Sequence, residues 1–148
     1  MRLSRNFYLY ELTKSQTAER HGIDNSPSQE EIKFLKSLCI HILQPIRDRF
    51  GVPITPSSGY RSLELNRLIG SKDTSDHVKG MAVDFEVPGK SNYQVAQWIE
   101  ENLEYSQLIL EFYRGGNTGW IHCSYNPDSL KRQSLTFNGK NFKNGLVA

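Results

Sequence analysis

The chain has 148 residues, of which 37% are hydrophobic and 23% are charged. This composition is typical of a folded chain rather than a disordered one, and the length favours a single domain. The formal net charge of +2, without any basic run, does not indicate a nucleic-acid-binding protein. No apolar run approaches the ~18 residues that a membrane-spanning helix needs. We therefore expect neither nucleic acid nor a membrane among the partners.

The N-terminus and the cysteines bear on where the protein works. Met1 to Ser4 are not followed by an apolar stretch typical of a signal peptide, so we expect synthesis in a cytoplasm without a signal peptide. The only cysteines, Cys39 and Cys123, provide neither a disulfide framework nor a paired-cysteine zinc site. Any metal would have to be bound mainly by carboxylates and by the 4 histidines.

Helical patterns dominate residues 1–50, which we interpret as a helical lead-in. Residues 10–20 carry helix-forming side chains and end at a plausible left-handed cap. A capping box at Ser28 opens a second, amphipathic helix whose apolar stripe is most simply part of the core. Pro45 should kink this helix or restart it.

The rest of the chain divides into a central region of about 52–125 and a polar tail of 126–148. Strands are predicted over 52–57, 81–87, 107–113 and 119–125, with one more near 135–137. Helices are predicted over 62–69 and 91–103. Because strands and helices do not alternate regularly, the predicted fold class is α+β, a mostly antiparallel sheet with helices packed on one face.

A hairpin is predicted around the turn signal of residues 114–119. If the turn is centred between Gly116 and Asn117, Glu111 lies directly opposite His122, so both share one face of the sheet. The outward face would then carry Glu111, Tyr113, Trp120, His122 and Ser124. The core face would carry Leu108, Leu110, Phe112, Ile121, Cys123 and Tyr125.

The strand 81–87 alternates, with apolar residues toward the core and Asp84 pointing away from it. His77 lies at the end of the preceding polar loop, and the small residues Gly80 and Ala82 allow that loop to fold close to the strand. Two imidazoles and one carboxylate, from His77, Asp84 and His122, could therefore converge.

A trio of this type fits a catalytic zinc, because three protein ligands leave one tetrahedral position for water. Zinc would polarise a carbonyl and lower the pKa of that water toward ~7. Glu111 is placed to accept the proton of the water, and Glu86, on the same face as Asp84, is the alternative base. The simpler interpretation of His77, Asp84 and His122 is a satisfied polar cluster.

Several strings of the sequence match a known family. They are SGYRS at 58–62, LN at 65–66, SDHVKGMAVD at 75–84 and WIH at 120–122, with TAERHGIDN at 17–25 near the start. Together they resemble the zinc D-alanyl-D-alanine carboxypeptidases, whose fold is shared with the Hedgehog signalling domain. The resemblance is closest to a branch common in bacteriophages and prophages, and it covers roughly Phe7 to Tyr125.

The resemblance implies a role for individual residues. His77, Asp84 and His122 would be the ligands of one zinc ion. Arg61 would hydrogen-bond substrate oxygens and stabilise the developing oxyanion, although a salt bridge to a nearby carboxylate is the structural alternative. Ser75 would orient the substrate or the loop. Trp120 shares the site face, where it either walls the pocket or is a partly exposed strand aromatic.

The resemblance also implies an activity. Family members hydrolyse amide bonds in peptidoglycan stem peptides, either D-Ala–D-Ala or, in some phage lysins, L-Ala–D-Glu. We expect a monomeric zinc peptidase that acts at the cell wall, with a phage tail or lysis protein as a further partner and a virion as a further location. The alternative is a non-catalytic, zinc-stabilised phage tail or wall-binding module, because a fold alone does not specify function.

Two positions depart from the family pattern. Several members carry the general base three residues before the last histidine, where this chain has Gly119. Glu111 is therefore our substitute for that base. Asp76, beside His77, stands where a neutral residue is more usual, and it should raise the negative potential near the metal.

Overall fold

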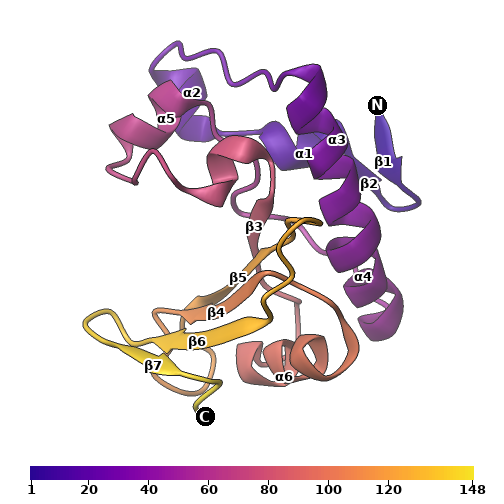
Figure 1. The fold of residues 1–148 in the computed structure, drawn as a ribbon, viewed down its shortest axis with the longest axis vertical. Helices are drawn as coiled ribbons and strands as arrows, with labels where there is room; N and C mark the ends of the chain where they lie inside the picture. The colour runs from indigo at the N-terminus through magenta and orange to yellow at the C-terminus, as the bar shows by residue number, and fades with distance from the viewer.

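The computed structural model describes residues 1–148 and has the expected α+β architecture (Figure 1). Its main sheet has five strands in the order β3-β5-β4-β6-β7. These are β3 (Ala82–Phe85), β4 (Gln107–Glu111), β5 (Trp120–Ser124), β6 (Gln133–Phe137) and β7 (Phe142–Asn144). Neighbouring strands are antiparallel except β4 and β6, which are parallel. The mostly antiparallel sheet is thus confirmed.

The helices come mainly from the first half of the chain. They are α1 (Leu9–Thr13), α2 (Gln16–Arg20), α3 (Gln29–Leu38), α4 (Gln44–Phe50), α5 (Leu63–Leu68) and α6 (Asn92–Asn102). A π-helical turn (Cys39–Leu43) joins α3 to α4, and a 3-10 turn (Asp76–Lys79) precedes β3. A small two-stranded sheet of β1 (Arg2–Ser4) and β2 (Phe7–Tyr8) lies beside α3. None of these helices combines the length and the apolar character needed to span a bilayer.

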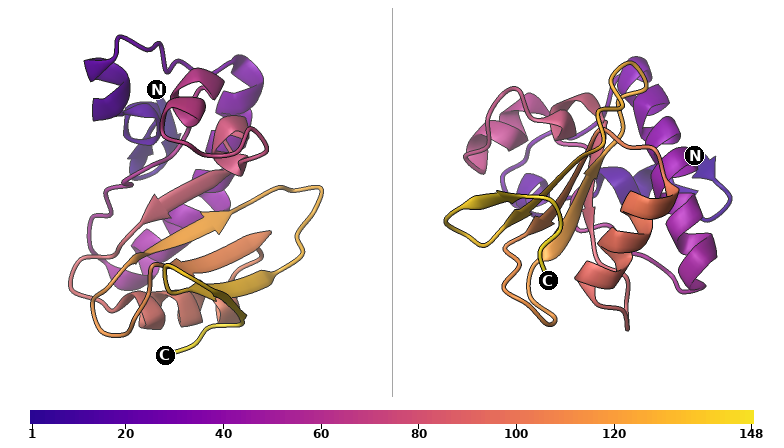
Figure 2. Two further views of the ribbon diagram at one scale, coloured as in Figure 1. Left: turned by 90° about the vertical axis from the view of Figure 1, so that its left-hand side faces the viewer. Right: turned by 60° about the horizontal axis from the view of Figure 1, so that its bottom comes forward.

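The sheet is covered on one face by α6 and by the long helix formed by α3 and α4 (Figure 2). Alternate residues of the central strands, Leu108, Leu110, Ile121 and Cys123, are fully buried in the main hydrophobic core on this side. The opposite face of β3 and β5 presents Asp84 and His122. Burial of one face of the sheet therefore directs the polar residues of the same strands to the other face.

The long helix follows its predicted signals. Ser28 Oγ accepts a hydrogen bond from the Glu31 amide while the Glu31 carboxylate accepts one from the Ser28 amide, which confirms the capping box. Pro45 stands in the first turn of α4, where its missing N–H is tolerated, directly after the π-helical turn. Gly51 ends α4 in the left-handed conformation, with φ of 69°.

Three predicted elements need correction. Residues 10–20 form two helices instead of one, because Lys14 is extended and Ser15 caps α2. The predicted strand at 52–57 is absent. At its end, Ser57 hydrogen-bonds to the Asp84 carbonyl and the next residue, Ser58, forms an isolated bridge with Asp84 of β3. The strand expected near 135–137 is confirmed as β6, but β7 was not predicted. Both strands lie in residues 126–148, which we expected to form a polar tail separate from the central region.

The predicted hairpin register is wrong by two residues. Glu111 pairs with Trp120, and Ile109 is the residue opposite His122. An even shift preserves which residues share a face, so Leu108 and Leu110 still face the core. The alternation fails after Glu111, where β4 ends.

The failure has a local cause at Phe112. This residue has a φ of 51°, which is rare for any residue except glycine. The kink turns the Phe112 ring out to 42% exposure and returns Tyr113 to the core at 7%. The sequence assigned both residues to the opposite faces.

Candidate functional site

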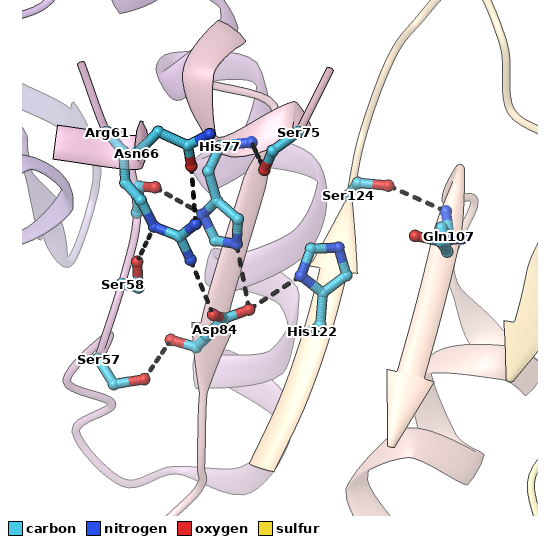
Figure 3. Close-up of polar contacts among 11 residues, drawn as sticks. Ser57, Ser58, Arg61, Asn66, Ser75, His77, Asp84, Gln107, His122 and Ser124 are labelled. Atoms are coloured by element: carbon cyan, nitrogen blue, oxygen red, sulfur yellow. Dashed lines mark hydrogen bonds and ion pairs between the residues drawn. The ribbon is translucent and has the colours of Figure 1, made fainter. Parts of the chain in front are cut away.

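His77, Asp84 and His122 come from three different segments and meet at the edge of the sheet formed by β3 and β5 (Figure 3). Asp84 on β3 is paired directly with His122 on β5, and His77 lies on the 3-10 turn before β3. Asp84 Oδ1 is 2.9 Å from Nδ1 of His122 and 3.3 Å from Nε2 of His77. One potential ligand atom from each residue lies within 4.8 Å of the other two. The structure thus brings together the three residues that the sequence analysis selected.

The turn that carries His77 is fixed at both ends. Ser75 caps the 3-10 turn by accepting a hydrogen bond from the His77 amide, and Gly80 ends it with φ of 76°. A Cβ atom at Gly80 would lie 2.8 Å from the backbone oxygen of Glu31, so only glycine lets the turn pack against α3. The expected close approach of the loop is therefore made at Gly80.

The backbone selects the tautomer of His77. Its Nδ1 lies 2.7 Å from the carbonyl oxygen of Gly59. A carbonyl oxygen only accepts, so Nδ1 must carry the proton and donate it. In the neutral ring Nε2 then has a free electron pair, and this atom is the one that faces Asp84.

The donor set fits a divalent cation. The carboxylate of Asp84 and the deprotonated Nε2 of His77 are both electron-pair donors, so their approach is unfavourable unless a proton or a cation lies between them. Nδ1 of His122 approaches the same carboxylate oxygen. Two imidazoles and one carboxylate match the ligands and number of a zinc site that leaves one position open.

Charges around Asp84 keep its carboxylate ionised. Burial acts to raise the pKa of Asp84, but His122 and His77, when a proton lies between their rings and the carboxylate, outweigh it and hold the pKa well below its ordinary value. Arg61 adds a positive charge, with Nη2 at 3.6 Å from Asp84 Oδ2. Asp84 is therefore available as an anionic ligand at neutral pH.

Arg61 is held by three neighbours. Its Nε donates to Ser58 Oγ at 3.0 Å, and Nη1 donates to Oδ1 of Asn66 at 3.0 Å. Burial lowers the pKa of Arg61, and the charge of Asp84 acts against this shift. The salt bridge that we weighed as an alternative thus exists, while the guanidinium still lies beside the candidate metal ligands.

Asn66 and Asn25 have structural roles that sequence reasoning missed. Asn66 is fully buried, and its Nδ2 donates to the Lys72 carbonyl while Oδ1 holds Arg61. Asn25 accepts from the Ser62 amide and donates to the Tyr60 carbonyl. Both asparagines belong to the sequence strings that carried the family resemblance, and this was the only signal from which their roles could have been predicted.

Glu111 lies diagonal to His122 across β4 and β5 instead of opposite to it. Diagonal residues on one face remain within reach of long side chains. Burial raises the pKa of Glu111, the charge of His122 lowers it, and the charge of Asp84 raises it, with a net upward shift. A carboxylate with a raised pKa close to the trio is suited to accept a proton.

Gly119 cannot be replaced by a carboxylate in this backbone. A Cβ atom at this position would lie 1.9 Å from the Glu111 carbonyl oxygen, and the residue has φ of 70°. The same Cβ atom would also lie 2.8 Å from the backbone carbonyl of Phe112. The acid that several family members carry at this position is therefore excluded by the backbone itself.

The other predicted residues lie around the site. Trp120 pairs with Glu111 and is partly exposed, so it borders the candidate base. Glu86, the alternative base, is exposed beyond the end of β3 and accepts a hydrogen bond from Asn92 Nδ2 at 3.1 Å. This contact directs Glu86 toward the start of α6, which favours Glu111 as the base.

A groove of about 720 Å³ leads away from Arg61. It lies between α1, α2, the segment 56–61 and α5, and Ser58 and Arg61 are among its lining residues. Lys14 and Glu19 supply charges of opposite sign elsewhere along it. The groove gives an extended ligand room next to the guanidinium.

Comparison with known proteins agrees with this geometry. No curated protein matches the chain significantly. The family model described as Peptidase M15 matches residues 5–124, a range that contains Arg61, the trio and Glu111. M15 peptidases are zinc-dependent, and the trio supplies the corresponding donor atoms. On its matched length and the arrangement of its candidate ligands, the chain belongs to the peptidase M15 family.

Proposed function

We propose that the protein is a zinc-dependent peptidase that hydrolyses an amide bond in peptidoglycan stem peptides, of the D-Ala–D-Ala carboxypeptidase or the L-Ala–D-Glu endopeptidase type. The observation that carries this proposal is the convergence of His77, Asp84 and His122 within 4.8 Å. Membership of the family supports peptide hydrolysis. The choice of stem peptides as the substrate rests on the motif resemblance. With this substrate the enzyme, which we propose to be a monomer, would act at the cell wall.

Zinc would be held by Nε2 of His77, the Asp84 carboxylate and Nδ1 of His122. When bound, it polarises the scissile carbonyl and lowers the pKa of a water molecule. The Gly59 carbonyl keeps His77 in the tautomer that binds a cation. The paired strands β3 and β5 fix Asp84 and His122 relative to each other.

In this mechanism Glu111 transfers the proton, and Arg61 stabilises the negative charge that develops on the substrate. Glu111 accepts a proton from the attacking water and returns it to the nitrogen of the leaving amine. The Arg61 guanidinium donates hydrogen bonds to the substrate oxygen on which negative charge develops. Three fixed contacts orient Arg61, which limits the reorganisation needed during the reaction.

Ser75 and Trp120 complete the proposed site. Ser75 acts on the loop through its contact with the His77 amide, and this contact favours loop positioning over direct substrate binding. Trp120, which pairs with Glu111, would border the bound substrate on the side of β5.

Mass spectrometry of purified muropeptides tests the proposal directly. The protein is incubated with them alone, with a chelator, and after chelation followed by added zinc. We expect loss of one defined fragment from the stem peptide, abolished by the chelator and restored by zinc. The mass of the fragment identifies the bond.

A stable zinc complement without any cleavage product would overturn the enzymatic proposal. That result would favour the alternative, a zinc-stabilised tail or wall-binding module. Cleavage that is insensitive to chelation would instead remove the metal from the mechanism. Glu111→Gln separates these cases, because it should retain zinc and lose hydrolysis.

A further inference from the structure

Four aromatic side chains, from β5, the residue after β4, β6 and β7, form a continuous row. The aromatic row consists of Trp120, Phe112, Phe137 and Phe142. Phe112 stacks on Trp120 with ring centroids 5.1 Å apart and meets Phe137 edge-on at the same distance. Phe137 stacks on Phe142 at 4.4 Å. The spacing of each pair is that of interacting aromatic rings.

The aromatic row is not part of the protein core. None of its four members belongs to the main hydrophobic cluster, which lies on the helix-covered face of the sheet. Phe112 is 42% exposed and Phe142 is 58% exposed. Exposed aromatic side chains that form one contiguous patch indicate a binding surface more often than scattered ones do.

Phe112, whose ring joins Trp120 to Phe137 in the row, has a strained backbone. A left-handed phenylalanine is unfavourable relative to glycine, which adopts the same φ without steric cost. Strained residues persist where the surrounding structure holds them, and they cluster at binding sites. The chain places glycine at Gly119, on the other side of the hairpin, but a large aromatic ring at Phe112.

The row begins at the candidate active site. Trp120 is paired with Glu111 and lies two positions before His122 on β5. The row then runs away from the site, across β4 and β6, to the edge strand β7. A ligand bound along the row would therefore extend directly from the proposed catalytic groups.

The polar groups near the row suit a hydroxylated, anionic ligand. Asn144 lies on the same face of β7 as Phe142, and Lys140 lies in the turn between β6 and β7, whereas Lys143 pairs with Thr136 on the opposite face. From Ser129 to the last residue the chain contains no Asp or Glu. Amides hydrogen-bond sugar hydroxyl groups, and lysines attract carboxylates.

We propose that the aromatic row binds the glycan strand of peptidoglycan while the attached stem peptide reaches the site at Glu111. The apolar C–H face of a pyranose ring packs on aromatic rings, and its equatorial hydroxyls are then free to hydrogen-bond with a neighbouring amide such as that of Asn144. This inference rests on the proposed function, because it assigns the non-peptide part of the same substrate to a second surface.

Binding of peptide-free glycan strands of alternating N-acetylglucosamine and N-acetylmuramic acid tests the inference. These strands contain no scissile bond, so the result does not depend on whether the peptidase proposal holds. The chain has 2 tryptophans. In a Trp98→Phe background, Trp120 is the only fluorescent tryptophan and reports binding from within the row.

Phe142→Ala is the main variant, because this ring is exposed on an edge strand and does not contact Trp120 directly. We expect it to weaken glycan binding about three- to tenfold, the effect of losing one aromatic contact. Phe112→Gly removes a ring while relieving the backbone strain, and we expect a similar loss. Tyr8→Ala is the control, because Tyr8 is 48% exposed in the separate β1–β2 sheet.

Three outcomes would overturn the inference. One is saturable binding that Phe142→Ala and Phe112→Gly leave unchanged. Another is that glycan strands change the Trp120 fluorescence no more than the same concentration of an unrelated dextran does. The third is concentration-dependent dimerisation that Phe142→Ala abolishes without any glycan binding, which would assign the row to a second copy of the chain.

Discussion

The carbonyl oxygen of Gly59 accepts a hydrogen bond of 2.7 Å from Nδ1 of His77. The contact joins the segment that carries Arg61 to the turn that carries a candidate metal ligand. Gly59 is itself packed against α1, since its Cβ position lies 2.4 Å from the Leu12 carbonyl oxygen. The adjacent Tyr60 amide donates to that same oxygen. The orientation of His77 therefore depends on how closely the segment lies against α1.

Gly59→Ala should weaken zinc binding without removing a ligand. The added methyl group overlaps the backbone of α1, so the segment must move and the hydrogen bond to His77 must lengthen. Loss of such an orienting contact lowers metal affinity by about 10- to 100-fold. Competition with a chromogenic chelator measures the change.

Gly89→Ala is the matched control for this experiment. No atom lies within 4 Å of the Cβ position of Gly89. Because its φ is 77°, an alanine there strains the backbone but meets no neighbouring atom. We expect a small loss of stability and no change in zinc affinity. Equal zinc affinities for Gly59→Ala and the unmodified protein would contradict the proposed orienting role.

Glu111→Gln should abolish hydrolysis while leaving the metal in place. The amide keeps the size of the side chain but cannot accept the proton of the attacking water. General-base residues contribute at least about 100-fold to rate, so we expect a fall of that size in kcat and an unchanged zinc content. The assay is hydrolysis of a soluble stem peptide, with zinc measured by elemental analysis.

Glu86→Gln provides the comparison, because Glu86 shares the strand face of Asp84 but hydrogen-bonds to Asn92. Its rate should remain close to that of the unmodified enzyme. A reversed result, with activity lost in Glu86→Gln and kept in Glu111→Gln, would transfer the role of the base to Glu86.

The fold class and the convergence of the three candidate ligands could be predicted from the sequence, because both depend on the local alternation of apolar and polar residues along the strands. In β3, apolar residues alternate with Asp84, and burial of one face fixes the direction of the other. The prediction for His122 followed from the same rule in β5. Loop closure around His77 required only small residues, and Gly80 provides the close contact.

The exact pairing of β4 and β5 could not be predicted, because a residue other than glycine adopts positive φ at Phe112. Nothing in the local sequence marks this kink, and it shifts Glu111 from His122 to Trp120. The strand β7 was also missed. It has only 3 residues and all are exposed, so no alternation of apolar and polar residues indicates a strand.

Asn66→Leu should reduce turnover through its effect on Arg61. The substitution removes the acceptor of Arg61 Nη1 and leaves the guanidinium with Ser58 and Asp84 as partners. Misplacing a catalytic group by about 1 Å can lower the rate about 100-fold. We therefore expect kcat/KM to fall by about 10- to 100-fold. Zinc affinity should not change, since Asn66 does not contact the three ligands.

Asn66→Asp tests whether this effect is one of positioning. Aspartate retains an oxygen that accepts from Arg61 but loses the Nδ2 donor to the Lys72 carbonyl. We expect it to be destabilised, as Asn66→Leu is, and yet to recover most of the activity. Equal losses in both variants would indicate that Asn66 only stabilises the fold.

The two cysteines predict how stability varies in alkaline solution. Both are fully buried. Burial, assisted by the charge of Glu11, raises the pKa of the Cys39 thiol from 9.0 to about 12, and burial also raises the pKa of Cys123.

A folded-state pKa above the unfolded one stabilises the protein below the unfolded value, and this contribution is lost as pH rises toward the folded value. The melting temperature should therefore fall as pH rises above 9.0 toward about 12, and Cys39→Ala should reduce the slope of this fall. Tyr60 contributes to the same trend, because burial and a hydrogen bond to Glu31 raise its pKa to about 12. A thiol reagent isolates the cysteines, since both should react only after unfolding. Rapid reaction in the native state would show that the thiols are not buried.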